Sequence, residues 1–305
     1  MRSVWKSGVI VTALSVCFAA PNHAPTPHLP STSPQYRVKL GPFIVPPTRN
    51  VGMVVQARFN GGPVLRLLLD SGAQYAVIDR KAAARSGCIG GSDLDLIGAG
   101  ASTPTVVKMQ RAETLRVGSL TLHDVPVVIQ DRKLADGIQG ALPLSIFSEF
   151  LIRLDIPGKS LDLLPYPADQ TNLEGALPTL ENNRVLFLKG TVNDKSEGYF
   201  LLDTGATYSA ISHKVARELH IAELMVERIP LHGGTAEMDA PLLRGTVRLR
   251  LGSRELAADP VVAVDLSGPS RYHRIEIAGL IGYPALTDSV LTVNYRDHLI
   301  RIEPR

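Results

Sequence analysis

The amino-acid sequence predicts an all-β fold made of two homologous lobes with few short helices. The first observation is a near repeat: VLRLLLDSGAQYAVID at residues 64–79 and YFLLDTGATYSAIS at residues 199–212. The second is that the segments around both copies follow the same order. The third is that most segments alternate apolar and polar residues, which is the period of a half-buried strand. The 305 residues leave room for two lobes of ordinary size, and 22 Pro and 26 Gly are typical of many turns.

The first 19 residues are typical of a secretory signal peptide. Arg2 and Lys6 precede an apolar stretch, residues 8–18, that is short for a membrane span, and Cys17-Phe18-Ala19 offers a small-x-small cleavage site. Residues 20–35 are polar and rich in Pro, which predicts a disordered spacer. We therefore expect an exported protein, periplasmic or secreted.

Two alternatives remain open for this N-terminal segment. The apolar stretch could stay uncleaved and anchor the protein to the envelope membrane. Lipidation of Cys17 is a second route to anchoring, although Val16 stands where the lipoprotein pattern has a small residue.

The remaining chain divides into an N-terminal lobe, residues 36–167, and a C-terminal lobe, residues 168–305. Each lobe is predicted to contain a strand hairpin that ends in Asp, a short apolar strand and a short helix. A Gly-bearing segment, an alternating strand pair, an apolar-Gly segment and a closing hairpin follow. The matched ranges, in this order, are 54–70 and 187–203, 76–79 and 209–212, 80–87 and 213–220, 96–103 and 230–237, 115–129 and 247–264, 137–143 and 279–286, and 151–165 and 291–304.

In both repeats an aspartate ends an apolar strand, where strand propensity does not favour it. Asp70 and Asp203 would therefore project from the ends of core strands, and Gly72 and Gly205 permit a sharp turn and a close approach. Packing about a pseudo-two-fold axis would bring the two carboxyl groups face to face. Like charges in a partly dry site raise one pKa, so the pair would share one proton. Such a pair can take a proton from a water molecule and give one to a substrate carbonyl, with no covalent intermediate.

With these motifs, the chain from Tyr36 to Arg305 resembles aspartic peptidases of the pepsin and retropepsin type. The resemblance rests on LLLDSGA, FLLDTGA and the apolar-apolar-Gly segments that end at Gly140 and Gly282. It implies that each lobe is a β-barrel and that a pseudo-two-fold axis relates the two lobes. It also implies an endopeptidase that cleaves peptide or protein substrates with Asp70 and Asp203 as the catalytic dyad.

The resemblance also implies roles for the residues around the dyad. Ser71 and Thr204 would form a hydroxyl network between the lobes, and the site would be supported by four glycines: Gly72, Gly140, Gly205 and Gly282. Two lobes in one chain resemble pepsin, whereas the short lobes and the residues Ala73 and Ala206 resemble retroviral enzymes, which are homodimers of single lobes. The duplication would make a dimer unnecessary, so we expect an active monomer.

Three features depart from the family pattern. Gln139 replaces an apolar residue in the first support segment, and its amide needs a partner if it is buried. No segment copies the pepsin flap with its Tyr; instead Gly98-Ala99-Gly100 and His232-Gly233-Gly234 resemble retroviral flap tips that would cover the cleft from both sides. Once the signal peptide is removed, Cys88 would be the only cysteine, so no internal disulfide is expected.

The sequence lacks the residue patterns that metal sites, nucleic-acid-binding sites and serine hydrolases require. The eight His do not fall at metal-ligand spacing and there is no HExxH, so neither a metal nor another cofactor is expected. A net charge of +3 without a Lys/Arg block gives no reason to expect nucleic-acid binding. A serine-hydrolase G-x-S-x-G motif is missing.

Two other functions fit the same fold. One is a catalytically silent protein that binds peptides or assembles with a partner; the other is a non-catalytic scaffold at the cell surface. The intact Asp-Ser-Gly and Asp-Thr-Gly triads count against both. A working dyad predicts a bell-shaped pH profile. The resemblance implies that a hydroxyl at the positions of Ala73 and Ala206 would stabilise the charged form of the dyad; alanine has none, so we expect a mildly acidic optimum.

Overall fold

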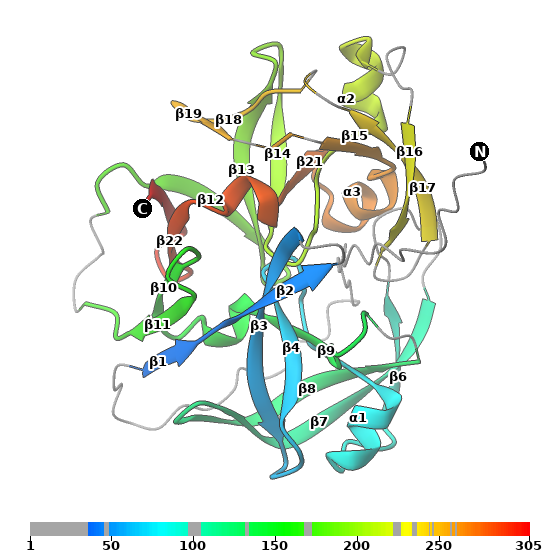
Figure 1. Ribbon diagram of the computed structural model, residues 1–305, viewed down its shortest axis with the longest axis vertical. Helices are drawn as coiled ribbons and strands as arrows, with labels where there is room; N and C mark the ends of the chain where they lie inside the picture. Colours follow the sequence, from blue (N-terminus) through cyan, green and yellow to red (C-terminus); the bar gives the residue numbers. More distant parts are fainter. Residues whose placement is uncertain are drawn as a thin grey trace, which may run out of the picture.

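The computed structural model describes residues 36–45, 49–96, 105–131, 134–167, 173–221, 227–233, 237–243, 245, 247–256, 258–259 and 261–305. The predicted signal peptide, Cys17 and the spacer lie outside these residues. Strands dominate the described chain, with three short α-helices (Figure 1). The predicted all-β, two-lobed fold is confirmed.

The N-terminal lobe is a sheet of eight strands that curls into a barrel, because β3 pairs with β7 as well as with β4. Asp79 caps the helix that follows β5, since its Oδ1 accepts a hydrogen bond from Ala82 N. In sheet order the strands are β2 (Gly41–Val45), β3 (Arg49–Phe59), β4 (Leu65–Asp70), β9 (Gly140–Pro143), β5 (Ala76–Asp79), β8 (Leu120–Gln130), β7 (Thr105–Val117) and β6 (Ser92–Leu96), with helix α1 at Arg80–Arg85 and a 3-10 turn, η1, at Leu144–Phe147.

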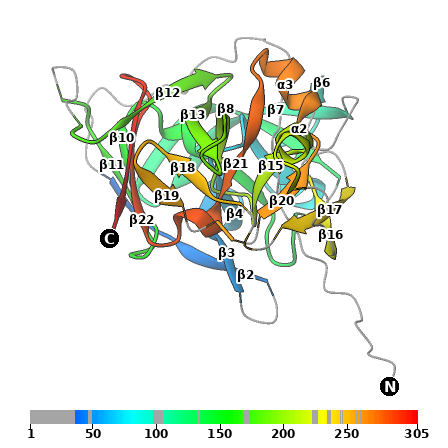
Figure 2. The same cartoon turned by 90° about the horizontal axis from the view of Figure 1, so that it is seen from above.

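The C-terminal lobe repeats this plan. Ser212 caps the helix that follows β15, and Figure 2 shows this helix beside β15 and β20. The strands in order are β13 (Val185–Val192), β14 (Ser196–Asp203), β21 (Ile277–Gly282), β15 (Ser209–Ser212), β20 (Val261–Val264), β17 (Glu237–Leu243) and β16 (Glu227–His232), with β18 (Leu249–Leu251) and β19 (Arg254–Leu256) branching from β13, helices α2 (His213–Glu218) and α3 (Ser267–His273), and a 3-10 turn, η3, at Tyr283–Leu286.

The duplication extends to the strand register. In each lobe the strand that ends in Asp runs parallel to a later strand, which in turn pairs antiparallel with the short strand after the Asp loop. Ile78 lies opposite Gly140 in the first lobe, and Ile211 lies opposite Gly279 in the second. A Cβ at Gly140 would lie 1.8 Å from the Val77 carbonyl oxygen, so this crossing accepts only glycine.

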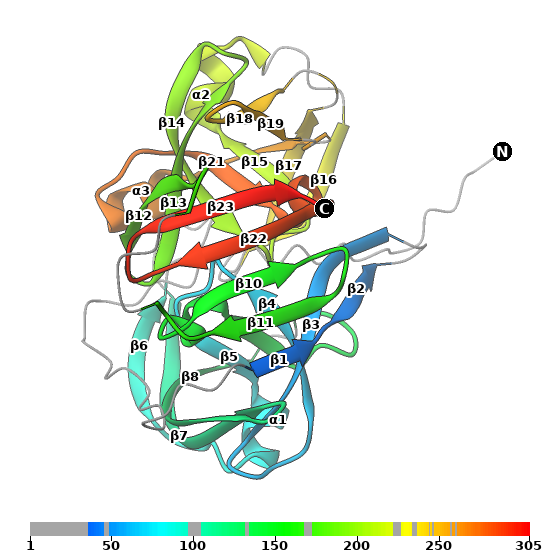
Figure 3. The same cartoon turned by 90° about the vertical axis from the view of Figure 1, so that its left-hand side faces the viewer.

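One antiparallel sheet joins the two lobes, and Figure 3 shows it face on between them. Its centre is the pairing of β10 with β22, in which Ile152 lies opposite Val293 and Leu154 opposite Leu291. The closing hairpins of both repeats therefore meet in one sheet. In order its strands are β1 (Tyr36–Lys39), β11 (Ser160–Leu164), β10 (Leu151–Asp155), β22 (Ser289–Asn294), β23 (Leu299–Pro304) and β12 (Leu177–Asn182).

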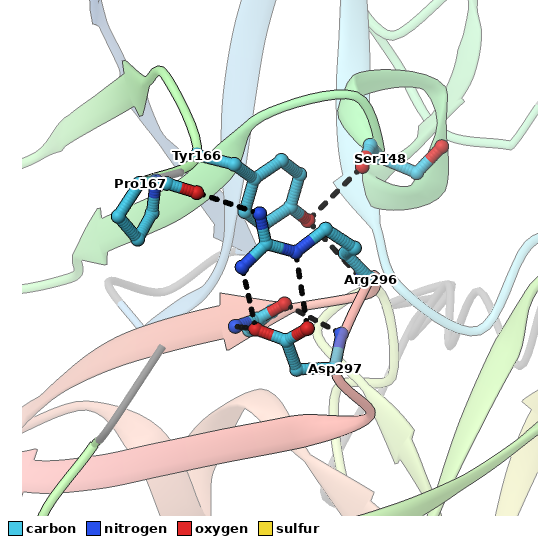
Figure 4. Close-up of polar contacts among 6 residues, drawn as sticks. Ser148, Tyr166, Pro167, Arg296 and Asp297 are labelled. Carbon is cyan, nitrogen blue, oxygen red and sulfur yellow. Dashed lines mark hydrogen bonds and ion pairs between the residues drawn. The ribbon is translucent and has the colours of Figure 1, made fainter. Parts of the chain in front are cut away.

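A polar clasp ties the end of the first lobe to the hairpin β22–β23 (Figure 4). The Arg296 guanidinium lies 4.7 Å from the ring centre of Tyr166 and donates a 2.8 Å hydrogen bond to the Pro167 carbonyl. Tyr166 donates its hydroxyl to the Ser148 carbonyl at 3.1 Å, and Asp297 accepts two hydrogen bonds from the same guanidinium. The clasp fixes the point where the chain leaves the first lobe. The predicted lobe boundary, between residues 167 and 168, stays a prediction, because residues 168–172 lie outside the described chain.

The main apolar core runs through both lobes and the sheet between them. Leu67, Leu154, Leu202 and Leu291 are all fully buried members of it. Each buried leucine of this kind contributes about 1.5–3 kcal/mol of transfer free energy. No helix among the described residues is long and apolar enough to cross a membrane.

Candidate active site

The ends of β4 and β14 bring two aspartates together. The side chains of Asp70 and Asp203 are both fully buried. A Cβ added to Gly72 would lie 2.7 Å from Cγ of Asp203, and a Cβ added to Gly205 would lie 2.5 Å from Cγ of Asp70. Each carboxyl group therefore rests against the glycine of the opposite lobe, a contact that no larger residue allows.

One oxygen of each carboxyl group is fixed by its own loop. Gly72 N donates a 2.8 Å hydrogen bond to Oδ1 of Asp70, and Gly205 N donates a 3.0 Å hydrogen bond to Oδ1 of Asp203. The same bond thus recurs at the same place in both lobes. These backbone groups fix the orientation of both carboxyl groups.

Two hydroxyl groups link the loops across the lobe interface. Ser71 N donates to Oγ1 of Thr204 at 3.0 Å, and Thr204 N donates to Oγ of Ser71 at 3.0 Å. Each hydroxyl then donates to a carbonyl of the other lobe: Ser71 Oγ to Leu202 at 2.8 Å, and Thr204 Oγ1 to Leu69 at 2.9 Å. All four bonds are buried, so the two loops are held rigidly against each other.

Replacement of Thr204 by Val is expected to destabilise the protein by about 2–5 kcal/mol, because Ser71 N and the Leu69 carbonyl would both lose their buried partner. The free energy of unfolding in urea measures this loss. Thr204→Ser keeps the hydroxyl and should cost about 1 kcal/mol or less. Equal stability of the Val and Ser variants would contradict the structural role of this hydroxyl.

Burial dominates the electrostatics of the pair. It raises the pKa of Asp203 to about 7, against the opposing effect of hydrogen bonds with Asp70 and with the backbone N–H groups of Gly205 and Ala206. Near neutral pH the two carboxyl groups therefore hold a proton between them and titrate as a unit.

Strand β21 places the predicted glycine, Gly282, next to the second aspartate. Gly282 lies beside Asp203 in parallel register. Its N–H donates to the Ser209 hydroxyl at 3.0 Å, and the next residue, Tyr283, donates its N–H to the Ala206 carbonyl at 2.9 Å. The Ser209 hydroxyl is a support that sequence reasoning missed, since a Ser in a short apolar strand gives no signal of its own.

The predicted equivalence of Gly140 and Gly282 is wrong by three residues. Asp70 lies beside Pro143, whereas Gly140 lies beside Leu67. Gly140 therefore corresponds to Gly279 at the strand crossing, and a proline takes the place of the second supporting glycine. Each segment contains two glycines three residues apart, so the sequence alone does not show which glycine of the first lobe corresponds to which glycine of the second. The pairing of the strands decides this correspondence.

The structure also accounts for Gln139, the polar residue that departs from the family pattern in this segment. This residue precedes β9, where its side-chain Oε1 accepts a 2.9 Å hydrogen bond from Arg66 N. Its own N–H donates to the Arg66 carbonyl and its carbonyl accepts from Asp79 N. The amide thus has the partner that its chemistry requires.

The flap predictions fall partly outside the described residues. Gly98, Ala99, Gly100 and Gly234 are among the residues that the structure does not describe. His232 ends β16 opposite Glu237 of β17, and its Nδ1 lies 3.2 Å from the glutamate Oε1; Gly233 follows. That these tips cover a substrate cleft stays a prediction.

The described residues contain no cluster of three or more His, Cys, Asp or Glu that could hold a metal ion. Cys88 is buried, with its thiol 3.6 Å from the Ser86 carbonyl. Burial raises the pKa of this thiol, which disfavours the reactive thiolate.

Comparison with known proteins agrees with this geometry. A family model described as aspartyl protease matches residues 55–145 and 188–285, one segment in each repeat. Among solved structures, the chain is similar to the crystal structure of aspartic proteinase from Irpex lacteus, with a TM-score of 0.55 and 12% sequence identity over 89% of this chain and 97% of that one. No curated protein sequence matches the chain. The predicted resemblance in fold and family is confirmed.

Proposed function

Because the chain belongs to the aspartyl protease family, we propose that it is an endopeptidase in which Asp70 and Asp203 activate a water molecule to hydrolyse peptide bonds. The observation that carries this proposal is the reciprocal packing of two buried carboxyl groups, each against the glycine of the opposite lobe. Both catalytic groups stand on one chain, so the proposed active form is a monomer.

The proposed reaction uses the shared proton of the pair. The ionised carboxylate takes a proton from water, and the protonated carboxyl donates its proton to the oxygen of the substrate carbonyl. Water oxygen bonds to the carbonyl carbon and gives a tetrahedral diol. Transfer of a proton to the amide nitrogen then lets the C–N bond break, which yields a carboxylic acid and an amine, and the enzyme carries no covalent intermediate.

The proposed substrate is an extended peptide or protein segment bound between the lobes by main-chain hydrogen bonds. Export to the periplasm or the medium, directed by residues 1–19, is part of the same proposal. Neither a metal nor another cofactor enters the chemistry.

Activity is expected to follow a bell-shaped pH profile with a mildly acidic optimum. The active form of the dyad is singly protonated. It is lost as pH rises through about 7, because the proton that the two carboxyl groups share then leaves. On the acid side, protonation of the second carboxyl group removes the base. Measurement of kcat/KM for a cleaved peptide between pH 3 and pH 9, each buffer with and without a chelator, tests this. A flat profile, or loss of activity with the chelator, would exclude the dyad mechanism.

A further inference from the structure

A groove of about 1190 Å³ lies on the outside of the N-terminal lobe, away from the two aspartates. Most of its lining residues belong to the segment from β1 to β2 and to β3 and β4. Figure 1 labels these four strands. Neither aspartate lines it, and neither do the loop residues next to them.

The groove carries an excess of positive charge. Lys39, Arg58, Arg66 and Arg116 all line it with exposed side chains, and none of the four forms an ion pair with an acid among the described residues. Among the described residues that line the groove, Asp136 is the one acid. A further cation of the lining, Arg37, is held by Asp162.

Two of these arginines lie directly opposite each other. Arg58 on β3 pairs in register with Arg116 on β7. Like charges at such a position destabilise a sheet unless something compensates them. Within the described part of the chain, their guanidinium groups donate only to local carbonyls, Arg58 to Gly62 at 3.1 Å and Arg116 to Gly118 at 3.2 Å.

The C-terminal lobe provides an internal comparison. Thr191 and Arg250 occupy the positions of Arg58 and Arg116. There the arginine is neutralised: Arg250 lies 2.5 Å from Asp194 and 3.4 Å from Glu255. Lys189, at the position of Gln56 in the first lobe, is paired in the same way with Glu197.

The first lobe has no acid at the positions that correspond to Asp194, Glu197 and Glu255. The hairpin turns correspond, because Asn60 Oδ1 accepts from Thr114 N as Asn193 Oδ1 accepts from Arg248 N. In this alignment Gly61 replaces Asp194 and Val64 replaces Glu197. On the neighbouring hairpin, Thr121 lies opposite Arg116 where Glu255 lies opposite Arg250, so the unpaired cations are specific to one copy of a repeated structure.

Apolar side chains accompany the cations. Ile44 and Val64, which also line the groove, expose 55% and 41% of their surface. The aromatic residue of the lining, Phe43, is buried, so it offers no face on which a nucleic-acid base could stack. Strand β2 forms the end of its sheet and pairs only with β3 among the described residues.

We propose that this groove binds an acidic polypeptide segment in an extended conformation. Carboxylates of the segment would pair with Arg58, Arg66 and Arg116, and its apolar residues would cover Ile44 and Val64. The concave shape suits a single chain, whereas an anionic membrane presents a plane. An added strand on the edge of β2 would supply main-chain hydrogen bonds. This binding is separate from peptide hydrolysis.

The test measures binding of a fluorescein-labelled peptide of alternating Glu and Val by fluorescence anisotropy. The full chain carries Asp203→Asn, so that the probe is not cleaved. Thr121→Glu gives the first lobe the acid that the second lobe has, opposite Arg116; Thr121→Gln is the control of equal size without charge. The peptide should bind to the parent and to the Gln variant alike, and roughly tenfold more weakly to the Glu variant. Binding should also weaken as salt rises from 50 to 200 mM, because salt screens the attraction between solvent-exposed charges.

Three outcomes would overturn the proposal. One is the absence of saturable binding of the peptide to the parent. Another is equal affinity of the Glu and Gln variants, which would place the peptide elsewhere. The third is tighter binding of vesicles rich in anionic lipid, or of single-stranded DNA, than of the peptide. A circular dichroism melting curve of each variant shows that it is folded.

Discussion

Replacement of Asp70 or Asp203 by Asn is expected to lower kcat/KM for peptide cleavage by roughly 10³-fold or more. Asparagine has nearly the same shape as aspartate, but its amide can neither take a proton from water nor give one to the carbonyl of a substrate. Both carboxyl groups belong to one site, so each single substitution should remove the activity and the double variant should add little. A peptide library incubated at several pH values, with and without pepstatin, measures the effect.

The matched control is Asp288→Asn, which changes an exposed aspartate outside the site and should leave cleavage unchanged. Full activity in either single variant of the dyad would contradict a shared site. If the folded wild-type chain, freed of residues 1–35, cleaves nothing under any condition, a silent peptide-binding protein becomes the better account of the fold.

The second large effect is expected from a single methyl group. Gly205→Ala would place a Cβ 2.5 Å from Cγ of Asp70, and Gly72→Ala would place one 2.7 Å from Cγ of Asp203. Contacts this short force the carboxyl group to move, and a misplacement of about 1 Å at a reacting group costs on the order of 10²-fold in rate. Both variants should therefore lose about 10²-fold in kcat.

The control for these variants is Gly41→Ala, whose added Cβ would meet nothing closer than the Val54 carbonyl oxygen at 3.9 Å. It should keep wild-type kcat. Stopped-flow or steady-state assays on the same peptide give kcat and KM separately. A loss confined to KM, or a Gly205→Ala variant as fast as the Gly41→Ala control, would show that the carboxyl groups do not depend on these close contacts.

Local patterns in the sequence predicted much of the fold and of the candidate site. The apolar runs before Asp70 and Asp203, and the glycines after them, reflect constraints within a few residues: a buried strand, a turn and a close approach. Such constraints leave a direct mark on residue type. The paired loops and the hairpins of each lobe follow from them.

Other features depend on contacts between segments far apart in the chain, so no local sequence pattern predicts them. Pro143 occupies the place beside Asp70 that the sequence predicted for Gly140, because strand register is decided by the partner strand. The two closing hairpins were visible, but their union through β10 and β22 is a property of two packed lobes. Helix α3 carries Gly268 and Pro269 in a short span, a composition that indicates a turn as readily as a helix.

The sheet that joins the lobes also affects how the two halves of the site can evolve. When the two halves of a site belong to two identical chains, every mutation appears in both halves, and the chains associate only at sufficient concentration. Here β10 and β22 belong to one polypeptide, so the halves stay together at any dilution and each can diverge alone. Pro143 beside one aspartate and Gly282 beside the other record such divergence, as do Thr121 and Glu255 on the outer faces.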